Sequence, residues 1–232
     1  MSEKRFVIAI DGPAASGKSS TAQWVARRLA FHHVDSGALY RAATAVQLDR
    51  STDPEAWAEE EVLAGTGRIS FVPSNGTFVP LIDGAAADEV LRGASVTRNV
   101  SRVAKMPRVR AWVNTQVRLA ADARSVVVDG RDIGTVVFPN ADLKVFLVAD
   151  PWERARRRLI QRLGHSPTDE EIALETEQLV HRDAKDATQT VQATDAVLID
   201  TTYLTQEDQV ERIVALAKAV THRHGGTSEV DG

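Results

Sequence analysis

The sequence GPAASGKS, residues 12–19, decides the fold class of this 232-residue chain. It follows the apolar, β-branched run RFVIAI at residues 5–10, which predicts a buried strand. It also opens the stretch at residues 17–30, whose apolar residues recur at helical spacing. A strand, the pattern G-x-x-x-x-G-K-[ST] and a helix in this order predict a phosphate-binding loop, and an ordinary glycine-rich turn is the minority alternative.

The chemistry of this loop points to a nucleoside triphosphate. Its glycines let the chain curl so that N–H groups point inward at phosphate oxygens, and the helix N-terminus adds positive potential. Lys18 is expected to reach the β- and γ-phosphates of ATP, and the Ser19 hydroxyl is expected to bind the bridging Mg²⁺ ion. The residues predicted to bind the ATP phosphates are Gly12, Pro13, Ala14, Ala15, Ser16, Gly17, Lys18, Ser19 and Ser20.

Outside this loop, helical patterns alternate with short apolar runs. This alternation predicts an α/β fold with a parallel, doubly wound sheet flanked by helices. Ser36 is the expected N-cap of one helix, and Thr168 with Glu171 has the spacing of a capping box. The predicted strands are residues 125–128, 143–148 and 196–199, and the predicted helices are residues 36–48, 95–104 and 107–123 and a helix that begins at Pro54 after the cap Asp53.

The pattern changes at GRISFVPSNGTFVPLIDG, residues 67–84. Asn75-Gly76 lies there between short alternating runs, which is a strong signal for a β-hairpin. We therefore predict a small β-rich insert over residues 66–92 within a single domain that spans residues 1–225. The tail, residues 226–232, is expected to be disordered.

Composition excludes several classes of protein. The formal net charge of −4 argues against a general nucleic-acid binder, which needs an excess of Lys and Arg on one face. The absence of cysteine excludes disulfides and Cys-ligated zinc and agrees with a reducing cytosol. The N-terminal stretch lacks the features of a secretory signal, and no apolar run is long enough to span a bilayer, so a cytoplasmic protein without a membrane partner is expected.

Charged side chains follow the second predicted strand in VVVDGRD, residues 126–132. Paired carboxylates at Asp129 and Asp132 suggest acid–base catalysis or a metal site, and Arg131 between them suggests an anionic substrate. In DSGALYR, residues 35–41, Ser36, Tyr40 and Arg41 can share one helix face. Taken alone, this stretch favours an ordinary capped surface helix, but beside a phosphate-binding loop Arg41 can hold a second phosphate group.

Five arginines lie on one predicted helix in WERARRRLIQRL, residues 152–163. Such a charge run is usually a solvated face, but in an acidic protein a mobile arginine-rich segment that closes over a transferred phosphoryl group is a serious alternative. HRDAKDA, residues 181–187, adds Arg182, Asp183 and Asp186, and is uninformative alone.

Together these motifs resemble the cytidylate kinases of the bacterial type, a family of P-loop nucleoside monophosphate kinases. The matching pieces are IDGPAASGKSS, DSGALYRA, SRVAKMPRVR, VDGRDIGTVVFPNADLKVFL and AVLIDTT, and the resemblance runs from about residue 6 to about residue 220. The phosphate-binding loop specifies only a nucleotide enzyme, whereas DSGALYR and DGRDIGTVVFP together are much more specific. The family also carries a small β-rich insert, which agrees with the hairpin pattern near Asn75-Gly76.

The resemblance implies the reaction of ATP with CMP or dCMP to give ADP and CDP or dCDP, with Mg²⁺ as cofactor and a monomeric enzyme. It implies a lid over residues 152–187, in which Arg154 and Arg158 join Lys18 and Arg131 as catalytic residues and Arg157 contacts ATP. The substrate-binding residues are expected to be Ser36, Arg41 and Arg131 near the CMP phosphate, Ser101, Arg110 and Asp132 at cytosine, Arg182 and Asp186 near the phosphate and pentose, and also Tyr40.

This reaction suggests separate tasks for the charges in DGRD. The acceptor oxygen of a phosphate is already ionised at neutral pH, so positioning and charge stabilisation can supply nearly all of the catalysis without a strong base. Asp132 is then a reader of the cytosine amino group, since carboxylates accept from that group, and Arg131 is a phosphate clamp. Asp129 either orients the waters of Mg²⁺ or only holds the turn.

The chain departs from the family pattern at Gln189. The family has an arginine three residues after the position of Asp186, followed by a longer loop, whereas only five residues separate Gln189 from Asp195 here. One contact to the sugar or phosphate that the resemblance implies is therefore missing, and this contact bears on the preference between CMP and dCMP.

Two other functions compete with this interpretation. A kinase of the same fold could act on UMP or another acceptor, and a panel of monophosphates would separate these cases. A nucleotide-dependent switch would bind ATP without releasing ADP in response to CMP, although the N-K-x-D motif of a guanine switch is absent.

Overall fold

The computed structural model describes residues 5–51, 53–122 and 124–225, so the predicted disordered tail lies outside the described residues. The chain divides into two compact units. The first unit comprises Met1–Phe31 and Val126–Gly232, and the second comprises His32–Ser125.

A four-stranded parallel sheet forms the centre of the first unit, in the order β6 (Val126–Asp129), β1 (Val7–Asp11), β7 (Leu143–Val148) and β8 (Val197–Asp200). Its inner strands are buried and mostly apolar, with Asp11 at the end of β1 and Lys144 in β7 as the charged exceptions, as expected for strands that are covered on both faces. This arrangement confirms the predicted α/β class and parallel sheet. The predicted strands agree with the observed ones to within two residues at each end.

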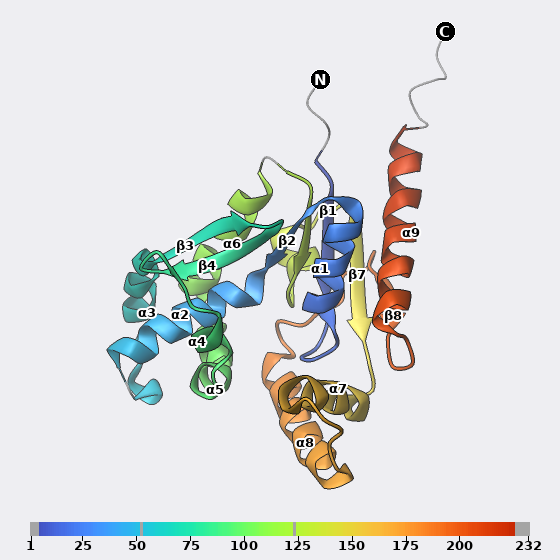
Figure 1. Ribbon diagram of the computed structural model, residues 1–232. Helices are drawn as coiled ribbons and strands as arrows, with labels where there is room; N and C mark the ends of the chain where they lie inside the picture. The colour runs from blue at the N-terminus through green and yellow to red at the C-terminus, as the bar shows by residue number, and fades with distance from the viewer. Residues whose placement is uncertain (1–4, 52, 123, 226–232) are drawn as a thin grey trace. The chain divides into compact units, whose positions relative to one another are not determined.

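Two helices pack side by side against this sheet (Figure 1): α1 (Lys18–Leu29) and α9 (Gln206–Gly225). Ala22 and Val25 of α1 join Val210 and Ile213 of α9 in a core with the sheet residues. Because α1 starts directly after the loop that leaves β1, this packing fixes the phosphate-binding loop between a buried strand and a buried helix.

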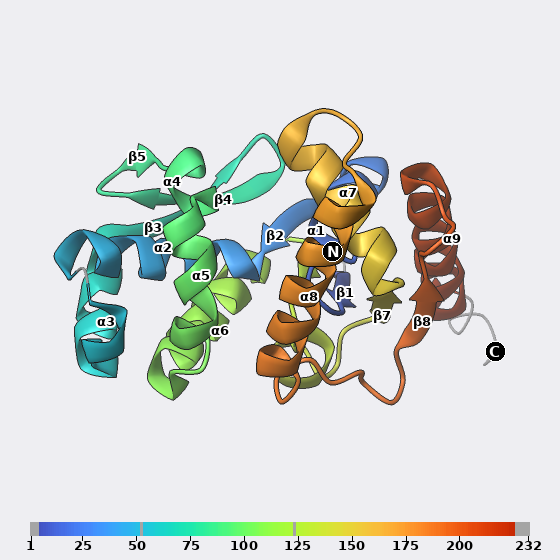
Figure 2. The same ribbon diagram turned by 90° about the horizontal axis from the view of Figure 1, so that it is seen from below.

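A helical hairpin completes the first unit. Helices α7 (Pro151–Leu163) and α8 (Asp169–Asp186) lie against each other (Figure 2), with Leu159, Ile172 and Leu179 buried between them. The predicted capping box is confirmed, since the Thr168 Oγ1 accepts from the Glu171 N–H at 3.3 Å and Glu171 Oε2 accepts from the Thr168 N–H at 2.8 Å. Ala14 of the phosphate-binding loop belongs to the same apolar cluster.

The second unit contains a small sheet in which β4 pairs antiparallel with β3 and β5 and parallel with β2. The turn between β3 and β4 is the predicted hairpin, with Asn75 at φ 49° and Gly76 at φ 77°. The elements of this unit are β2 (His32–Asp35), α2 (Ser36–Arg50), η1 (Pro54–Ala56), α3 (Glu59–Gly65), η2 (Thr66–Arg68), β3 (Ile69–Ser74), β4 (Thr77–Ile82), β5 (Ala85–Ala86), α4 (Asp88–Arg92), α5 (Ala94–Val103) and α6 (Pro107–Ala121).

Two local predictions in this unit are wrong. The N-cap of α2 is Asp35, whose Oδ1 accepts from the Ala38 N–H at 3.1 Å, and Ser36 is the first helical residue. The helix predicted to start at Pro54 is only a short 3₁₀ turn. The turn stops because the backbone of Trp57 is extended and its side chain is buried, with 7% of it exposed. The helix α3 starts two residues later.

Within the described parts of the chain, no helix combines the length and apolarity that a membrane crossing requires.

The strand β1 ends in the buried carboxylate of Asp11, which holds a π-helical turn, η3 (Ile133–Val137). Its Oδ1 accepts from the Ile133 N–H at 2.8 Å and its Oδ2 accepts from the Gly134 N–H at 2.7 Å. Burial raises the pKa of Asp11 from 3.8 to about 6 despite these two bonds. The turn that follows the DGRD segment is therefore held by a carboxyl group whose pKa is about 6.

We expect this carboxyl to make stability depend on pH. Because its pKa is higher in the folded protein, the native state binds a proton more tightly than the unfolded chain, so its contribution to the free energy of unfolding falls as the pH rises from about 4 through about 6. Asp11→Asn removes this titration. Between pH 4 and pH 7 the stability of the wild type relative to Asp11→Asn should fall by about 2–3 kcal/mol, measured by urea unfolding.

The matched control is Glu177→Gln, which neutralises an exposed carboxylate on α8. Its stability difference from the wild type should stay nearly constant over this range. An equally constant difference for Asp11→Asn would show that Asp11 does not titrate as its burial indicates.

Candidate active site

The phosphate-binding loop leaves β1 through a glycine that no other residue could replace. Gly12 has φ 144°, and a Cβ atom placed there would lie 2.1 Å from the carbonyl oxygen of Leu147 on β7. Gly17, at φ 87°, then turns the chain into α1. The two glycines thus allow the loop to curl between the sheet and the helix.

Lys18 is the first residue of α1, and its side chain turns back into the loop. Its Nζ donates to the carbonyl oxygen of Pro13 at 2.5 Å and to the hydroxyl oxygen of Ser16 at 3.4 Å. Burial lowers the pKa of Lys18 well below its usual value, and the positive charge of Arg131 adds to this effect. The predicted phosphate-binding lysine therefore lies inside the loop, near a second cation.

Ser19 and Asp129 meet at the loop exit. The Ser19 Oγ donates to Asp129 Oδ2 at 2.5 Å, and Asp129 lies opposite Ile10 in the register of β6 and β1. A hydroxyl and a carboxylate are oxygen donors that suit Mg²⁺, which takes its other ligands from water and substrate phosphates. Among the described residues there is no group of three His, Cys, Asp or Glu side chains able to hold a metal. The donor set thus fits an ion that arrives with a nucleotide.

Arg131, Asp186 and Arg182 form a charged cluster next to the loop. The buried carboxylate of Asp186 lies 3.6 Å from Arg131 Nε and 3.8 Å from Arg182 Nε. Arg131 Nε is buried and has no hydrogen-bond partner within the part of the chain that the structure describes. The cluster holds two guanidinium groups and one carboxylate, so it carries an excess of positive charge that favours an anion.

The arginines of α7 differ from one another: Arg156 is exposed and pairs with Glu153 on the same helix, as on a solvated face, whereas Arg154 is buried. Arg154 is 4% exposed, so it is no part of a solvated face. Its Nη1 donates to the carbonyl oxygen of Ala14 at 2.8 Å and to Asp183 Oδ2 at 2.6 Å, so it holds the phosphate-binding loop itself. In this structure the guanidinium of Arg154 is bound to the protein, and its catalytic role stays a prediction.

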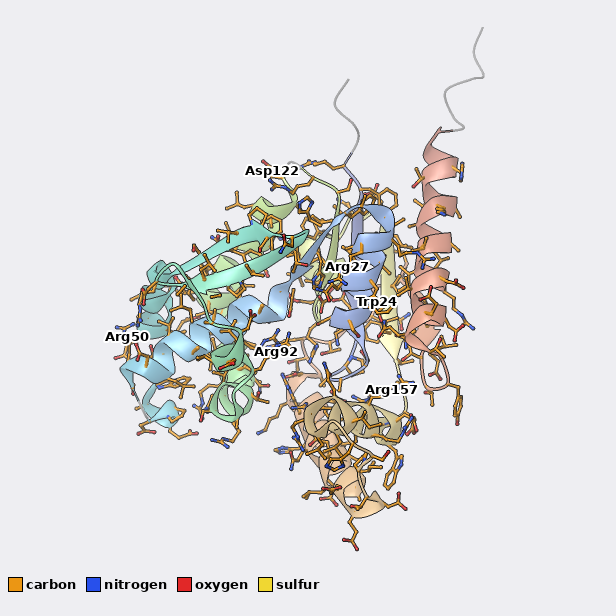
Figure 3. The ribbon with its side chains drawn as sticks, in the orientation of Figure 1. Trp24, Arg27, Arg50, Arg92, Asp122 and Arg157 are labelled. Atoms are coloured by element: carbon orange, nitrogen blue, oxygen red, sulfur yellow. The ribbon has the colours of Figure 1, made fainter. Side chains whose placement is uncertain are left out.

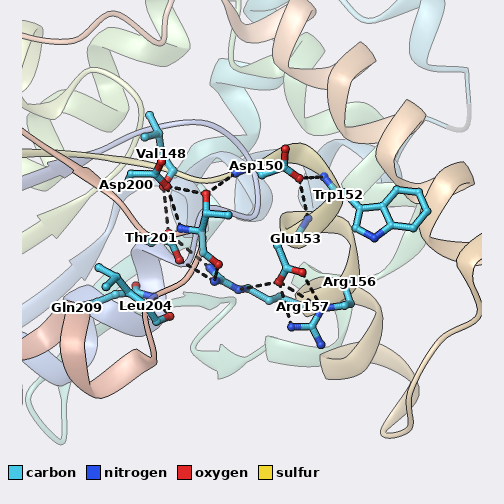
Figure 4. A network of polar contacts seen from close by, with 11 residues as sticks. Val148, Asp150, Trp152, Glu153, Arg156, Arg157, Asp200, Thr201, Leu204 and Gln209 are labelled. Atoms are coloured by element: carbon cyan, nitrogen blue, oxygen red, sulfur yellow. Dashed lines mark hydrogen bonds and ion pairs between the residues drawn. The ribbon is translucent and has the colours of Figure 1, made fainter.

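The remaining α7 arginines are also bound within the first unit. Arg157 extends from α7 toward the loop after β8 (Figure 3) and donates to the carbonyl oxygens of Thr201 at 2.6 Å and Thr202 at 2.8 Å (Figure 4). Arg158 and Arg162 lie 3.1 Å and 3.2 Å from the two carboxylate oxygens of Glu175 on α8. In this structure Arg158 and Arg162 therefore tie α7 to α8, and the lid role of Arg158 stays a prediction.

In the second unit, α2 carries the predicted group Ser36, Tyr40 and Arg41. Arg41 pairs with the capping carboxylate of Asp35, and the guanidinium of Arg110 on α6 lies 5.8 Å from the centre of the Tyr40 ring. Arg110 also donates to the carbonyl oxygen of Ala104 at 2.9 Å.

Two further predicted site residues, Ser101 and Asp132, and the departure at Gln189 lie on or next to helical elements. Ser101 lies on α5 and is half-buried. Asp132 is buried and directly precedes η3. Gln189 follows the end of α8, where its N–H donates to the carbonyl oxygen of Asp186 at 2.9 Å.

Two residues at this site had no predicted role. Asp11 ends an apolar strand as Asp129 does, and that position is a signal that could have identified it. Asp183 was visible in HRDAKDA, three residues before Asp186, but its partner Ala14 lies 169 residues away in the sequence, and no local pattern joins them.

Comparisons with known proteins agree with this geometry. A family model described as "Cytidylate kinase" matches residues 8–219. The chain is 38% identical over 231 residues to a cytidylate kinase of Lactiplantibacillus plantarum, covering 98% of this chain and 100% of that protein. It is 41% identical over 219 residues to a cytidylate kinase of Geobacillus thermodenitrificans, covering 92% and 97%.

Among solved structures, an uncharacterized protein from Eubacterium ventriosum has a TM-score of 0.52 at 11% identity, covering 93% of this chain and 99% of that one, and supports the fold alone. The chain therefore belongs to the cytidylate kinase family, and the predicted transfer of the γ-phosphoryl group of ATP to CMP or dCMP is the activity of that family.

Proposed function

We propose that this chain carries out that transfer with Mg²⁺ as cofactor, as a cytoplasmic monomer, and with the residues assigned below. The observation that supports the assignment best is the convergence, within the first unit, of Lys18, the Ser19–Asp129 pair and the Arg131 cluster around one phosphate-binding loop. No UMP-specific or switch function is supported by the family match.

The loop would bind the ATP phosphates with its N–H groups other than that of Ala14, which donates to Asp183. The Lys18 ammonium has three donors, so it would bind phosphate oxygens while it still donates to the Pro13 carbonyl. An ammonium that is already desolvated interacts strongly with an anion, because little hydration has to be removed on binding. Ser19 and Asp129 would hold Mg²⁺, directly or through water. When bound, this ion would neutralise charge on the β- and γ-phosphates.

Arg131 would clamp the acceptor phosphate, helped by Arg182 and by Arg41 of the second unit. Asp186 would keep the two guanidinium groups of the first unit apart and oriented, since it pairs with both. The attacking phosphate oxygen is ionised at neutral pH, so we assign no general base. Catalysis would then come from alignment and charge stabilisation.

Asp132 would read the cytosine amino group, with Ser101 and Arg110 at the base. A buried carboxylate accepts hydrogen bonds and cannot donate one when ionised, so it favours cytosine over uracil, which presents a carbonyl at that position.

The deciding experiment is coupled ADP release with CMP, dCMP, UMP and AMP as acceptors, with and without Mg²⁺. The proposal requires that CMP or dCMP gives the highest kcat/KM and that chelation of Mg²⁺ abolishes turnover. A higher kcat/KM for UMP would show that UMP is the acceptor. ATP binding without acceptor-dependent ADP release would favour a nucleotide switch.

Lys18→Ala should lower kcat by about 10²–10³-fold, because it removes a preorganised charge from the transferred phosphates. The measurement is ADP release at saturating ATP and CMP, with circular dichroism to confirm folding. Lys218→Ala, on an exposed position of α9, is the control and should keep wild-type turnover. Near-normal activity of a folded Lys18→Ala variant would remove the loop lysine from the mechanism.

Asp132→Asn should narrow the preference for CMP over UMP. The amide can turn its donor toward the uracil carbonyl, whereas cytosine would face an unpaired donor, which costs about 1–3 kcal/mol, or about 5- to 150-fold in the ratio of kcat/KM values. An unchanged ratio would assign base recognition to other residues.

Gln189→Arg should lower KM for CMP or dCMP, because a guanidinium adds rigid paired donors near Asp186 where Gln189 offers one neutral amide. Lys185→Ala should raise KM if Lys185 substitutes for the missing arginine. KM for CMP and KM for dCMP are measured in the wild type and in each variant. If Gln189→Arg has no effect, position 189 lies outside the site.

A further inference from the structure

One peptide group of the phosphate-binding loop is bound at both of its ends. The N–H of Ala14 donates to Asp183 Oδ1 at 3.0 Å, and the carbonyl oxygen of Pro13 accepts from Lys18 Nζ at 2.5 Å. These two polar groups belong to the same planar peptide unit, so rotation of one end must move the other. Asp183 on α8 is thus connected to the Lys18 ammonium through a single rigid group.

The next peptide group is held by the same side-chain pair. Arg154 Nη1 donates both to the Ala14 carbonyl oxygen at 2.8 Å and to Asp183 Oδ2 at 2.6 Å. Asp183 therefore uses one carboxylate oxygen for each partner, and the two side chains hold two successive peptides of the loop. Charge-assisted bonds of this kind are stronger and more directional than bonds between neutral groups.

The segment held in this way contains a conformation that needs support. Ala15, between the bound peptides and Gly17, has φ 56°, which is unfavourable for a residue with a Cβ atom. Ala14 belongs to one apolar cluster with Ala155, Leu159 and Leu179, and apolar contacts do not direct the polar groups of the two peptides beside it. Asp183 and Arg154 are the partners that the structure places there.

We propose that Asp183 is a positioning residue for phosphoryl transfer: with Arg154 it fixes the orientation of the Pro13–Ala14 peptide, and so the position of the Lys18 ammonium, for the triphosphate of ATP. This rests on the proposed function, since it concerns the donor side of the same reaction. Arg154 and Asp183 have a protein partner in this arrangement and need not touch the nucleotide.

The position of Asp183 also separates it from the acceptor side. Asp186, one turn further along α8, pairs with Arg131 and Arg182 through its own carboxylate. The helix itself is anchored to α7 by Glu175 and by the apolar residues Ile172 and Leu179. Loss of the Asp183 carboxylate charge should therefore affect the ATP side and leave the acceptor cluster in place.

The test compares Asp183→Asn with the wild type and with Glu177→Gln, an exposed neutralisation on the same helix. An asparagine has one oxygen and one NH₂ group, so it can accept from Ala14 or from Arg154 but not from both. We expect kcat/KM for ATP to fall about 10- to 100-fold. The Kd for CMP in the absence of ATP should change by less than about twofold, and Glu177→Gln should match the wild type.

Hydrogen exchange of the Ala14 amide supplies a readout that a general loss of stability would not give. In Asp183→Asn this amide should exchange faster while the amides of β1 and α1 keep their wild-type rates. Faster exchange throughout the unit, with ATP and CMP parameters falling together, would show a merely structural role and overturn the proposal. So would unchanged ATP kinetics in the folded variant.

If Asp183→Asn does not fold, Arg154→Lys takes its place, since one ammonium cannot hold the Ala14 carbonyl and Asp183 as the guanidinium fork does. The same selective loss in kcat/KM for ATP is then expected, and unchanged ATP kinetics would overturn the proposal. Absence of CMP-dependent ADP release by the wild type would refute the proposed function instead. Binding of a non-hydrolysable ATP analogue and exchange at Ala14 would still decide the role of Asp183.

Discussion

The buried ammonium of Lys18 is the charge on which the phosphate-binding end of the first unit depends. Removing an ammonium from water is costly, so the structure must surround it with acceptors and negative charges. The carboxylates of Asp129, Asp11 and Asp183 supply negative charge that favours the protonated form. They come from the ends of β6 and β1 and from α8, segments far apart in the sequence. The need to stabilise the charge of Lys18 therefore explains why acidic side chains from three elements converge on a site that binds an anion.

The helical hairpin beside the loop shows how the same residue type serves different purposes. Arg154 is buried against the loop, while Arg158 and Arg162 share the carboxylate of Glu175, whose side chain is 4% exposed. Removing both arginines would leave the buried carboxylate of Glu175 uncompensated, which is usually strongly destabilising. The arginines of α7 thus connect this helix to α8 and to the phosphate-binding loop. A closing motion would have to replace these bonds with bonds to the nucleotide.

The features that could be predicted from the sequence are those encoded locally. The phosphate-binding loop, the capping box of α8 and the Asn75-Gly76 turn each depend on residues within a few positions of one another, and the structure confirms all three. The cap of α2 was misassigned because Asp35 and Ser36 are both good capping residues and only backbone conformation decides between them. The contacts of Asp11 and Asp183 could not be predicted, since each joins segments more than 100 residues apart.

The DGRD segment shows how a few successive charges acquire separate surroundings. Asp129 is still part of β6, so the sheet register fixes it opposite Ile10 and within reach of Ser19. After Gly130 the chain leaves the sheet, and Arg131 lies beside Asp186 on α8. Asp132 then precedes the π-helical turn that Asp11 holds by its first two N–H groups. The end of a strand followed by an anchored turn thus points each side chain in its own direction, which a continuous strand or helix of the same sequence could not do.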